Sequence, residues 1–220
     1  MTREVIFVGT HSWSSVADVP LTHDAELWCA NEAHREIGGE KAARIFQLHP
    51  RNWREAERRY LTNGASDVHM SQDCFGRNPD HVEYLRTCGV PVYCQQLWPD
   101  IPTSVAYPFE RVTETVGIPL PPGGWVKRLW ATSTCGYLAA LALTEHIDDL
   151  RTGGAGVDVI GLAGIELPMG TQRERLWEWP NLAYYLGLAA GLGIDIRLPV
   201  QGSSLLSAPL YAIDGHPHPF

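Results

Sequence analysis

The stretch EVIFVGT, residues 4–10, indicates the fold class of this 220-residue chain. It is a short run of apolar and β-branched residues that stops at Gly-Thr, a pattern typical of a buried strand followed by a turn. Similar runs recur along the chain and predict strands at residues 25–34, 43–50, 89–96, 157–167 and 194–200. Because these runs are continuously apolar rather than alternating, we expect parallel strands that are buried on both faces.

Helical patterns alternate with these strands. Small and apolar residues recur at helical spacing in residues 136–147 and 181–193, and a further helix is expected after Asn52, a residue suited to an N-cap. This alternation predicts an α/β fold with a doubly wound, mostly parallel, Rossmann-like sheet. We expect residues 1–220 to form a single domain, with an irregular Pro-rich segment at about residues 97–125.

Composition excludes several classes of protein. The net charge of −8 argues against tight binding of duplex nucleic acid, because glutamates offset the basic stretch at residues 49–60. The five cysteines form no C-x-x-C pair, which disfavours a disulfide scaffold and a zinc ribbon and indicates a reduced, cytoplasmic type of protein. No signal peptide or membrane span is expected. The spacing of histidines and acidic residues predicts no metal site.

Polar residues follow several predicted strands, where open parallel sheets bind their ligands. The residues after the first two strands can bind a ligand through backbone, hydroxyl and amide groups. These candidates are Gly9, Thr10, Ser12, Asn31 and Glu32.

Two later strand ends supply catalytic candidates, His49 and Glu166, either of which could act as a general base. The loop after Glu166 adds Arg173, which could close over an anionic ligand.

The stretch ATSTCGYLAALAL, residues 131–143, begins a helix with an unusual number of hydroxyl groups. A cap needs one hydroxyl, yet Thr132, Ser133 and Thr134 supply three, and the small Cys135 and Gly136 would let a ligand approach the backbone. The stretch is therefore either a capped helix start or a helix N-terminus that binds an anion. The turn after the first strand is neither G-x-G-x-x-G nor a P-loop, which disfavours ordinary dinucleotide dehydrogenases and P-loop nucleotidases.

Several segments follow one another in an order that resembles the order in known proteins. The segments are WCANEAHR, QLHP, TSTCGYLAALAL, VIGLAGIEL and GIDIRLPVQGSSLL. Together they resemble an uncharacterised, widespread family of Rossmann-like proteins from tailed phages. They are more distantly similar to bacterial lipooligosaccharide sialyltransferases, to flagellin-modifying motility accessory factors and to archaeal-type 6-hydroxymethylpterin diphosphokinases.

In those sialyltransferases a Gly-Asn-Gly-Pro-Ser turn follows the first strand, a strand ends at Cys-Asn, and a Thr-Ser-Gly helix start precedes a strand ending Ser-Gly-Ile-Asp. The resemblance implies that residues 9–12 form the nucleotide-binding turn and that Asn31 contacts the donor. It implies that Ser133 and Thr134 contact the donor's charged sugar.

The resemblance extends to later positions of the chain, but the sequence also differs from the sialyltransferase pattern at several points. Glu166 stands in place of the aspartate, and residues 202–206, GSSLL, match a C-terminal Ser-Leu-Leu. The turn after the first strand lacks the second glycine and the proline. The segment that carries the catalytic histidine of the sialyltransferases is shortened, so His49, on another strand, is the expected substitute.

These observations predict a nucleotide-sugar-dependent glycosyltransferase of phage type, located in the cytoplasm of the infected host cell. It would need no cofactor and would take a nucleotide or nucleotide sugar as its ligand, with a modified DNA base or another phage component as acceptor. His49 or Glu166 would take the acceptor's proton, and Arg173 would neutralise the leaving phosphate.

Alternatives remain open. The first is a nucleotide-binding protein without turnover, such as a phage sponge for a signalling nucleotide. The others are a diphosphokinase-like phosphoryl transferase and a structural module with a vestigial pocket. The aromatic and apolar stretch YYLGLAAGLG suits either a homo-oligomer face or packing on the sheet.

Overall fold

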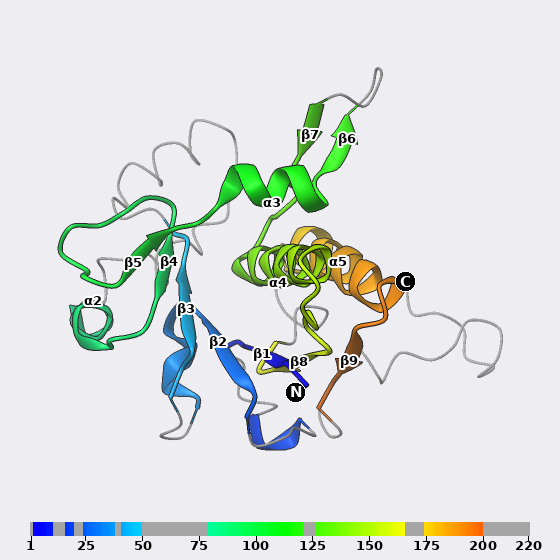
Figure 1. Ribbon diagram of the computed structural model, residues 1–220. Coiled ribbons are helices and arrows are strands. Elements are labelled where there is room, and N and C mark those ends of the chain that lie inside the picture. The colour runs from blue at the N-terminus through cyan, green and yellow to red at the C-terminus, as the bar shows by residue number, and fades with distance from the viewer. Residues whose placement is uncertain are drawn as a thin grey trace.

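The computed structural model describes residues 2–10, 16–19, 24–37, 41–49, 79–120, 126–165 and 174–199. Its centre is a seven-stranded sheet in the order β5-β4-β3-β2-β1-β8-β9, in which every neighbouring pair is parallel (Figure 1). The strands are β1 (Glu4–Val8), β2 (Glu26–Ala30), β3 (Arg44–Gln47), β4 (Val92–Cys94), β5 (Ser104–Ala106), β8 (Val159–Ala163) and β9 (Asp195–Arg197). The predicted parallel sheet is confirmed.

The order of the strands reverses beside β1. From β1 the chain adds β2, β3, β4 and β5 outward on one side, and then returns to place β8 and β9 on the other. In doubly wound sheets ligands commonly bind outside the carboxyl ends of the two strands where this reversal occurs, and in this sheet those strands are β1 and β8.

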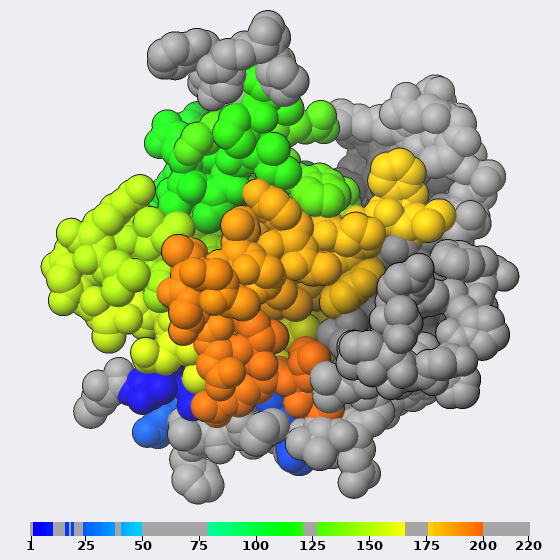
Figure 2. All heavy atoms as spheres, turned by 90° about the vertical axis from the view of Figure 1, so that its right-hand side faces the viewer, coloured from blue at the N-terminus to red at the C-terminus, as the bar shows by residue number. Residues whose placement is uncertain are grey.

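Helices cover both faces of the sheet, as predicted. On one face lie α3 (Phe109–Val116), α4 (Thr134–Arg151) and α5 (Trp179–Gly191). On the other lie α2 (Pro79–Thr87) and the 3-10 turns η1 (Val16–Asp18) and η2 (Asn31–Arg35). Figure 2 shows the side of the molecule that α5 and β9 cover.

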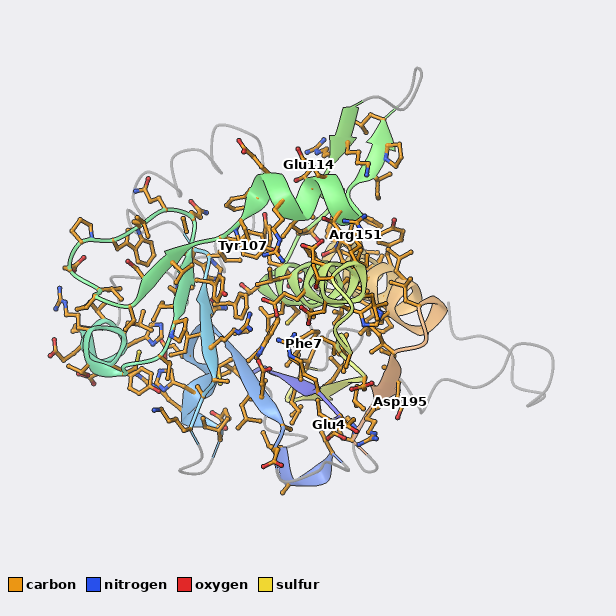
Figure 3. The ribbon with its side chains drawn as sticks, in the orientation of Figure 1. Glu4, Phe7, Tyr107, Glu114, Arg151 and Asp195 are labelled. Atoms are coloured by element: carbon orange, nitrogen blue, oxygen red, sulfur yellow. The ribbon has the colours of Figure 1, made fainter. Side chains whose placement is uncertain are left out.

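Successive side chains of each central strand point alternately to the two faces of the sheet. Phe7 lies between β1 and α4 (Figure 3), where Trp28 and Phe46 pack with it against Leu138. Its neighbour Ile6 belongs to the opposite cluster, with residues of α2. This two-sided burial explains why the strand sequences are apolar throughout.

Residues 97–120, the described part of the segment expected to be irregular, differ from that expectation. They contain β5, α3 and β6 (Ile118–Leu120), and β6 pairs with β7 (Val126–Arg128) in an antiparallel hairpin that projects beyond α3 (Figure 1). The prolines do not prevent these elements: Pro108 immediately precedes α3, and Pro119 lies inside β6, where the edge of a two-stranded ribbon tolerates a missing N–H. Val112 and Val116 bury one face of α3, a short amphipathic pattern that sequence reading overlooked.

The strands are shorter than expected at their ends, whereas α4 extends beyond the predicted residues 136–147 on both sides. The strand predicted for residues 25–34 stops at Ala30, and η2 takes up the polar Asn31 and Glu32. The helix predicted after Asn52 lies outside the described residues. None of the helices in the described part of the chain combines the length and apolar character that a bilayer crossing requires.

A cluster of charges joins α4 to the amino edge of the sheet. Arg3 reaches Glu26 at 2.8 Å and Glu145 of α4 at 2.7 Å, and Arg44 reaches the other oxygen of Glu145 at 2.5 Å. The Arg44 guanidinium also lies 4.3 Å from the centre of the Trp28 ring. Burial alone would raise the pKa of Glu26, but hydrogen bonds from Arg3 and Trp28 and the two arginine charges outweigh it, so that this pKa is lowered.

Candidate functional site at the carboxyl edge of the sheet

At the carboxyl ends of β1 and β8 the two backbones approach each other closely. The Gly9 amide donates to the Ala163 carbonyl at 2.8 Å, and a Cβ on Gly9 would lie 2.3 Å from the Gly164 carbonyl oxygen. Glycine is therefore required at position 9 for the packing of the two strand ends. The exposed Thr10 follows it, while Ser12 lies outside the described residues.

Asn31 adopts an uncommon backbone conformation at the end of β2. Its φ of 52° makes it the single non-glycine residue with positive φ among the described residues. Asparagine tolerates this left-handed region better than most residues, at some cost in free energy. Such conformations concentrate at functional sites, where they aim a side chain that an ordinary strand end would turn elsewhere.

The N-terminus of α4 uses its three hydroxyl residues in different ways. Ser133 is the N-cap, and its Oγ accepts from the Gly136 amide at 3.1 Å. The Thr132 hydroxyl donates to the Trp177 carbonyl at 2.6 Å. Thr134 places its hydroxyl oxygen 3.5 Å from Oδ1 of Asn31, across the edge of the sheet. Thr134 is thus the hydroxyl that links the helix start to a strand end.

Asn181 of α5 holds the extended chain that leads into α4. This fully buried side chain accepts from the Thr132 amide at 3.1 Å and donates to the Trp130 carbonyl. A Cβ on Gly136 would lie 2.0 Å from the Asn181 Oδ1. The expectation that Gly136 leaves room for a ligand is therefore wrong, because the space beside it is filled by Asn181.

The cap geometry predicts a measurable stability effect. Ser133→Ala removes the acceptor for the Gly136 amide, so we expect the free energy of unfolding to fall by about 1 kcal/mol. In urea denaturation the midpoint should decrease with an unchanged slope. Thr115→Ala is the matched control, because that exposed hydroxyl only bonds back to the Arg111 carbonyl within α3. An equal effect of both changes would contradict the capping role.

A second polar arrangement lies at the same edge, on the α2 side of the sheet. His34 Nε2 lies 3.1 Å from His81 Nδ1, and His81 Nε2 lies 2.9 Å from Oε1 of Gln47, the last residue of β3. His34 also stacks on Tyr84, with ring centroids 3.7 Å apart. The row of side chains runs from the η2 turn, which starts at Asn31, into the buried end of β3.

Both histidines are neutral at physiological pH. Burial lowers the pKa of His34 to about 4, helped by the neighbouring charges of His81 and Arg35. Burial and the Arg35 charge likewise lower the pKa of His81 to about 4. A neutral imidazole has one donor and one acceptor nitrogen, which lets it pass a proton or accept one.

The remaining predicted residues are placed as follows. Glu32 pairs with Arg35 in η2 at 3.4 Å. His49 is half-buried two residues beyond β3, a strand separated from β1 by β2. Glu166 and Arg173 lie outside the described residues, so their predicted roles stay predictions. The structure brings together Asn31 and Thr134, next to Ser133.

Sequence reading missed Asn181, His34, His81 and Gln47. A polar Asn at the start of the apolar pattern NLAYYLGLAAG was one available signal, and the buried Gln47 in IFQLHP was another. The histidine pair left no signal, because its members lie 47 positions apart in the chain.

No protein-family model matches this chain, and no curated protein sequence matches it. Two solved structures are similar in fold. One is the sialyltransferase CstII from Campylobacter jejuni in complex with a substrate analogue, cytidine-5'-monophosphate, with 13% identity, a TM-score of 0.46, and coverage of 93% of this chain and 83% of that one. The other is the sialyltransferase CST-II in complex with a trisaccharide acceptor and CMP, with 11% identity, a TM-score of 0.46, and coverage of 93% and 84%.

Proposed function

We propose that the protein is a nucleotide-sugar-dependent glycosyltransferase that binds its donor at the carboxyl ends of β1 and β2. Asn31 binds the donor nucleotide, and the N-terminus of α4 with Ser133 and Thr134 binds the phosphate or the charged sugar. Gly9 and Thr10 form the floor of this site. The acceptor we propose is a modified DNA base or another phage component, modified in the cytoplasm of the infected host cell.

The observation that carries this proposal is the meeting of Asn31 and Thr134. A left-handed Asn at a strand end and a hydroxyl at a helix start, 3.5 Å apart, come from segments separated by 103 positions. Neither the cap of α4 nor the packing of β2 requires the Thr134 hydroxyl, since Ser133 already caps the helix. An amide and a hydroxyl side by side at this edge of the sheet suit the polar groups of a nucleotide.

The helix start also suits the chemistry of glycosyl transfer. When the bond to the anomeric carbon breaks, negative charge grows on the leaving phosphate. The amides and dipole of the 18-residue α4 stabilise an anion at its N-terminus, where the first turn contains no acidic side chain. Arg173 is proposed to add a positive charge, and His49 or Glu166 stays a proposed proton acceptor from the sequence.

The test is a thermal-shift and mass-spectrometric screen of nucleotides, nucleotide sugars and cyclic dinucleotides. A donor at about 100 times its dissociation constant stabilises the fold by about 2.7 kcal/mol. Stabilisation together with release of free nucleotide supports the transferase. Stabilisation by a ligand that stays intact supports a binding protein without turnover, and a transferred diphosphate supports the diphosphokinase-like alternative.

The variant Asn31→Gly separates ligand binding from strain. Glycine adopts positive φ freely, so we expect the unliganded protein to keep its melting temperature while the donor-induced shift falls by at least half. The control Asn31→Ala loses the same amide but keeps the strained backbone, so it should also lower the melting temperature of the unliganded protein. A full donor-induced shift in Asn31→Gly would rule out a role for the amide in binding.

A further inference from the structure

Two exposed tryptophans lie beside the N-terminus of α4. Trp177 is 64% exposed, and Leu176 before it is 59% exposed in the same π-helical turn, η5 (Glu174–Glu178). Trp130, in the chain that enters α4, is 36% exposed, and its ring centroid lies 5.6 Å from that of Tyr184 in α5. In Figure 2 the gold segment that contains η5 stands out from the surface beside α5. Exposed apolar side chains close to a polar site commonly mark a place where a ligand binds.

Hydrogen bonds to the main chain fix the positions of both tryptophans. The Trp177 carbonyl accepts from the Thr132 hydroxyl at 2.6 Å, one residue before the Ser133 cap of α4. The Trp130 carbonyl accepts from the Asn181 amide group, whose oxygen accepts from the Thr132 amide at 3.1 Å. Both indole side chains therefore begin next to the residue that precedes the helix.

The fold uses the carbonyl of Trp177 and not its ring. Any residue at position 177 would offer the same carbonyl to Thr132, and a side chain with 64% of its surface in water adds little buried apolar area. The π-helical turn that carries the ring is a second unusual feature, because such turns are rare and frequently lie at functional sites. Stability therefore does not explain an exposed indole at this position.

The tryptophans lie on the side of the helix start that the donor nucleotide leaves open. Asn31, at the end of β2, meets Thr134 and is proposed to bind the nucleotide. Trp177 meets Thr132 just before α5, which packs on β9, and β9 lies on the other side of β1 from β2. In a nucleotide sugar the phosphate joins the nucleoside to the sugar. With the phosphate at the helix start and the nucleoside beside Asn31, the sugar and its acceptor would lie on the side of Trp177.

We propose that Trp177 and Trp130 form the acceptor subsite and that the acceptor presents a neutral pyranose ring to them. This inference rests on the proposed function. The face of an indole ring carries partial negative charge, and the C–H groups on one face of a pyranose ring are weakly positive, so the two faces attract each other. The hydroxyl groups at the edge of the sugar ring remain free to meet the donor.

The charge and the size of this surface favour a saccharide over other occupants. In RERLWE, residues 173–178, two glutamates balance two arginines, and the whole chain carries a net charge of −8, so a polyanion gains little attraction here. A stable protein partner needs about 800 Å² of surface on each side, more than two indoles and a leucine present. The pyranose ring belongs either to a free glycan or to a sugar attached to a DNA base, both within the acceptors proposed above.

The test compares sugar transfer with donor hydrolysis. CMP-sialic acid, UDP-glucose and GDP-mannose serve as donors. The methyl pyranosides of glucose, galactose and mannose serve as acceptors, beside a duplex oligonucleotide with and without a glucosylated base. Released nucleotide is measured by chromatography, the product by mass spectrometry, and water alone gives the rate of hydrolysis. A pyranose acceptor should raise nucleotide release above the rate in water.

Trp177→Ala removes the ring and keeps the carbonyl. We expect the KM for the pyranose acceptor to rise about tenfold or more, the order of effect known for a ring stacked on an aromatic side chain. Donor hydrolysis in water should stay within twofold, and the donor-induced thermal shift should remain. Trp177→Phe keeps an aromatic face and should recover most of the loss. Leu97→Ala, with a side chain also 64% exposed but between β4 and β5, is the control and should keep the wild-type KM.

Saturation-transfer NMR with the same methyl pyranosides tests the subsite without any donor. We expect signal transfer to the C–H groups of one face of the sugar, abolished in Trp177→Ala and kept in Leu97→Ala. If the wild type neither binds nor hydrolyses any donor, the proposed function fails, while this NMR signal would still support a saccharide subsite. Its absence would overturn the subsite as well.

The remaining outcomes judge the subsite in a protein that hydrolyses a donor. Transfer to methyl pyranosides supports a free glycan, and transfer to the glucosylated oligonucleotide alone supports a sugar on a base. Transfer to the unmodified oligonucleotide alone, or an unchanged KM in Trp177→Ala, overturns the subsite. Loss of the donor-induced shift in Trp177→Ala also overturns it, because the ring would then bind the donor.

Discussion

Gly9→Ala is expected to lower the free energy of unfolding by about 3 kcal/mol, the upper end of the usual range for a group forced into a packed site. The new methyl group would lie 2.3 Å from a backbone oxygen, that of Gly164, which cannot rotate away as a side chain can. The carboxyl ends of β1 and β8 would have to separate. For a chain of this size the melting temperature should drop by roughly 6–12 °C, measurable by calorimetry.

Gly187→Ala is the matched control for this change. Gly187 lies in α5, where a new methyl group would meet no atom within 4 Å, and alanine favours helix over glycine by about 1 kcal/mol. It should therefore raise the melting temperature slightly. A melting temperature for Gly9→Ala within 2 °C of the wild type, about the shift expected from 1 kcal/mol or less, would contradict the close approach of β1 and β8.

Glu145→Ala is expected to lower the free energy of unfolding by about 2 kcal/mol, because it removes one of the two carboxylates that Arg3 and Arg44 share, the other being Glu26. The side chains of Arg3, Arg44 and Glu145 are only 24%, 18% and 15% exposed, so water replaces little of the lost interaction. Urea denaturation at pH 7 measures the effect. Glu83→Gln, whose carboxylate is 67% exposed opposite Arg86, should change stability by less than about 0.5 kcal/mol.

The same charge cluster predicts that the free energy of unfolding falls as the pH becomes acidic. The pKa of Glu26 is lower in the folded protein than its ordinary value of 4.5, so the unfolded chain takes up a proton first as the pH falls. The stabilisation from Glu26 is present above about pH 4.5 and is lost as the pH drops through the lower folded pKa. Glu145→Ala should not abolish this acid sensitivity, since Arg3 still reaches Glu26.

The class of fold could be predicted because it depends on local patterns. The apolar run at β1 and the small-residue pattern of α4 are each readable within about a dozen residues, and their alternation leaves few topologies. The segment that contains α3 was misread because its prolines were taken as signs of irregular chain. In the structure Pro108 comes immediately before the helix instead of interrupting it.

The candidate site was predictable only in part. Asn31 and the hydroxyls of α4 follow from the rule that strand ends and helix starts gather at one edge of a parallel sheet. The contacts between segments, such as His34 with His81 or Asn181 with the chain before α4, depend on packing that no local pattern contains. The role expected for Gly136 was wrong for the same reason, since the neighbour that fills its space comes from another helix.

The anchoring of α4 has a consequence for ligand binding. Asn181 fixes the chain that enters the helix, and Glu145 ties its far half to Arg3 and Arg44. Held near both ends, α4 has little freedom to fray or unwind apart from the rest of the fold. The amides at its N-terminus are therefore already oriented in the unliganded protein, and an anion bound there, as we propose, would lose little affinity to ordering the helix.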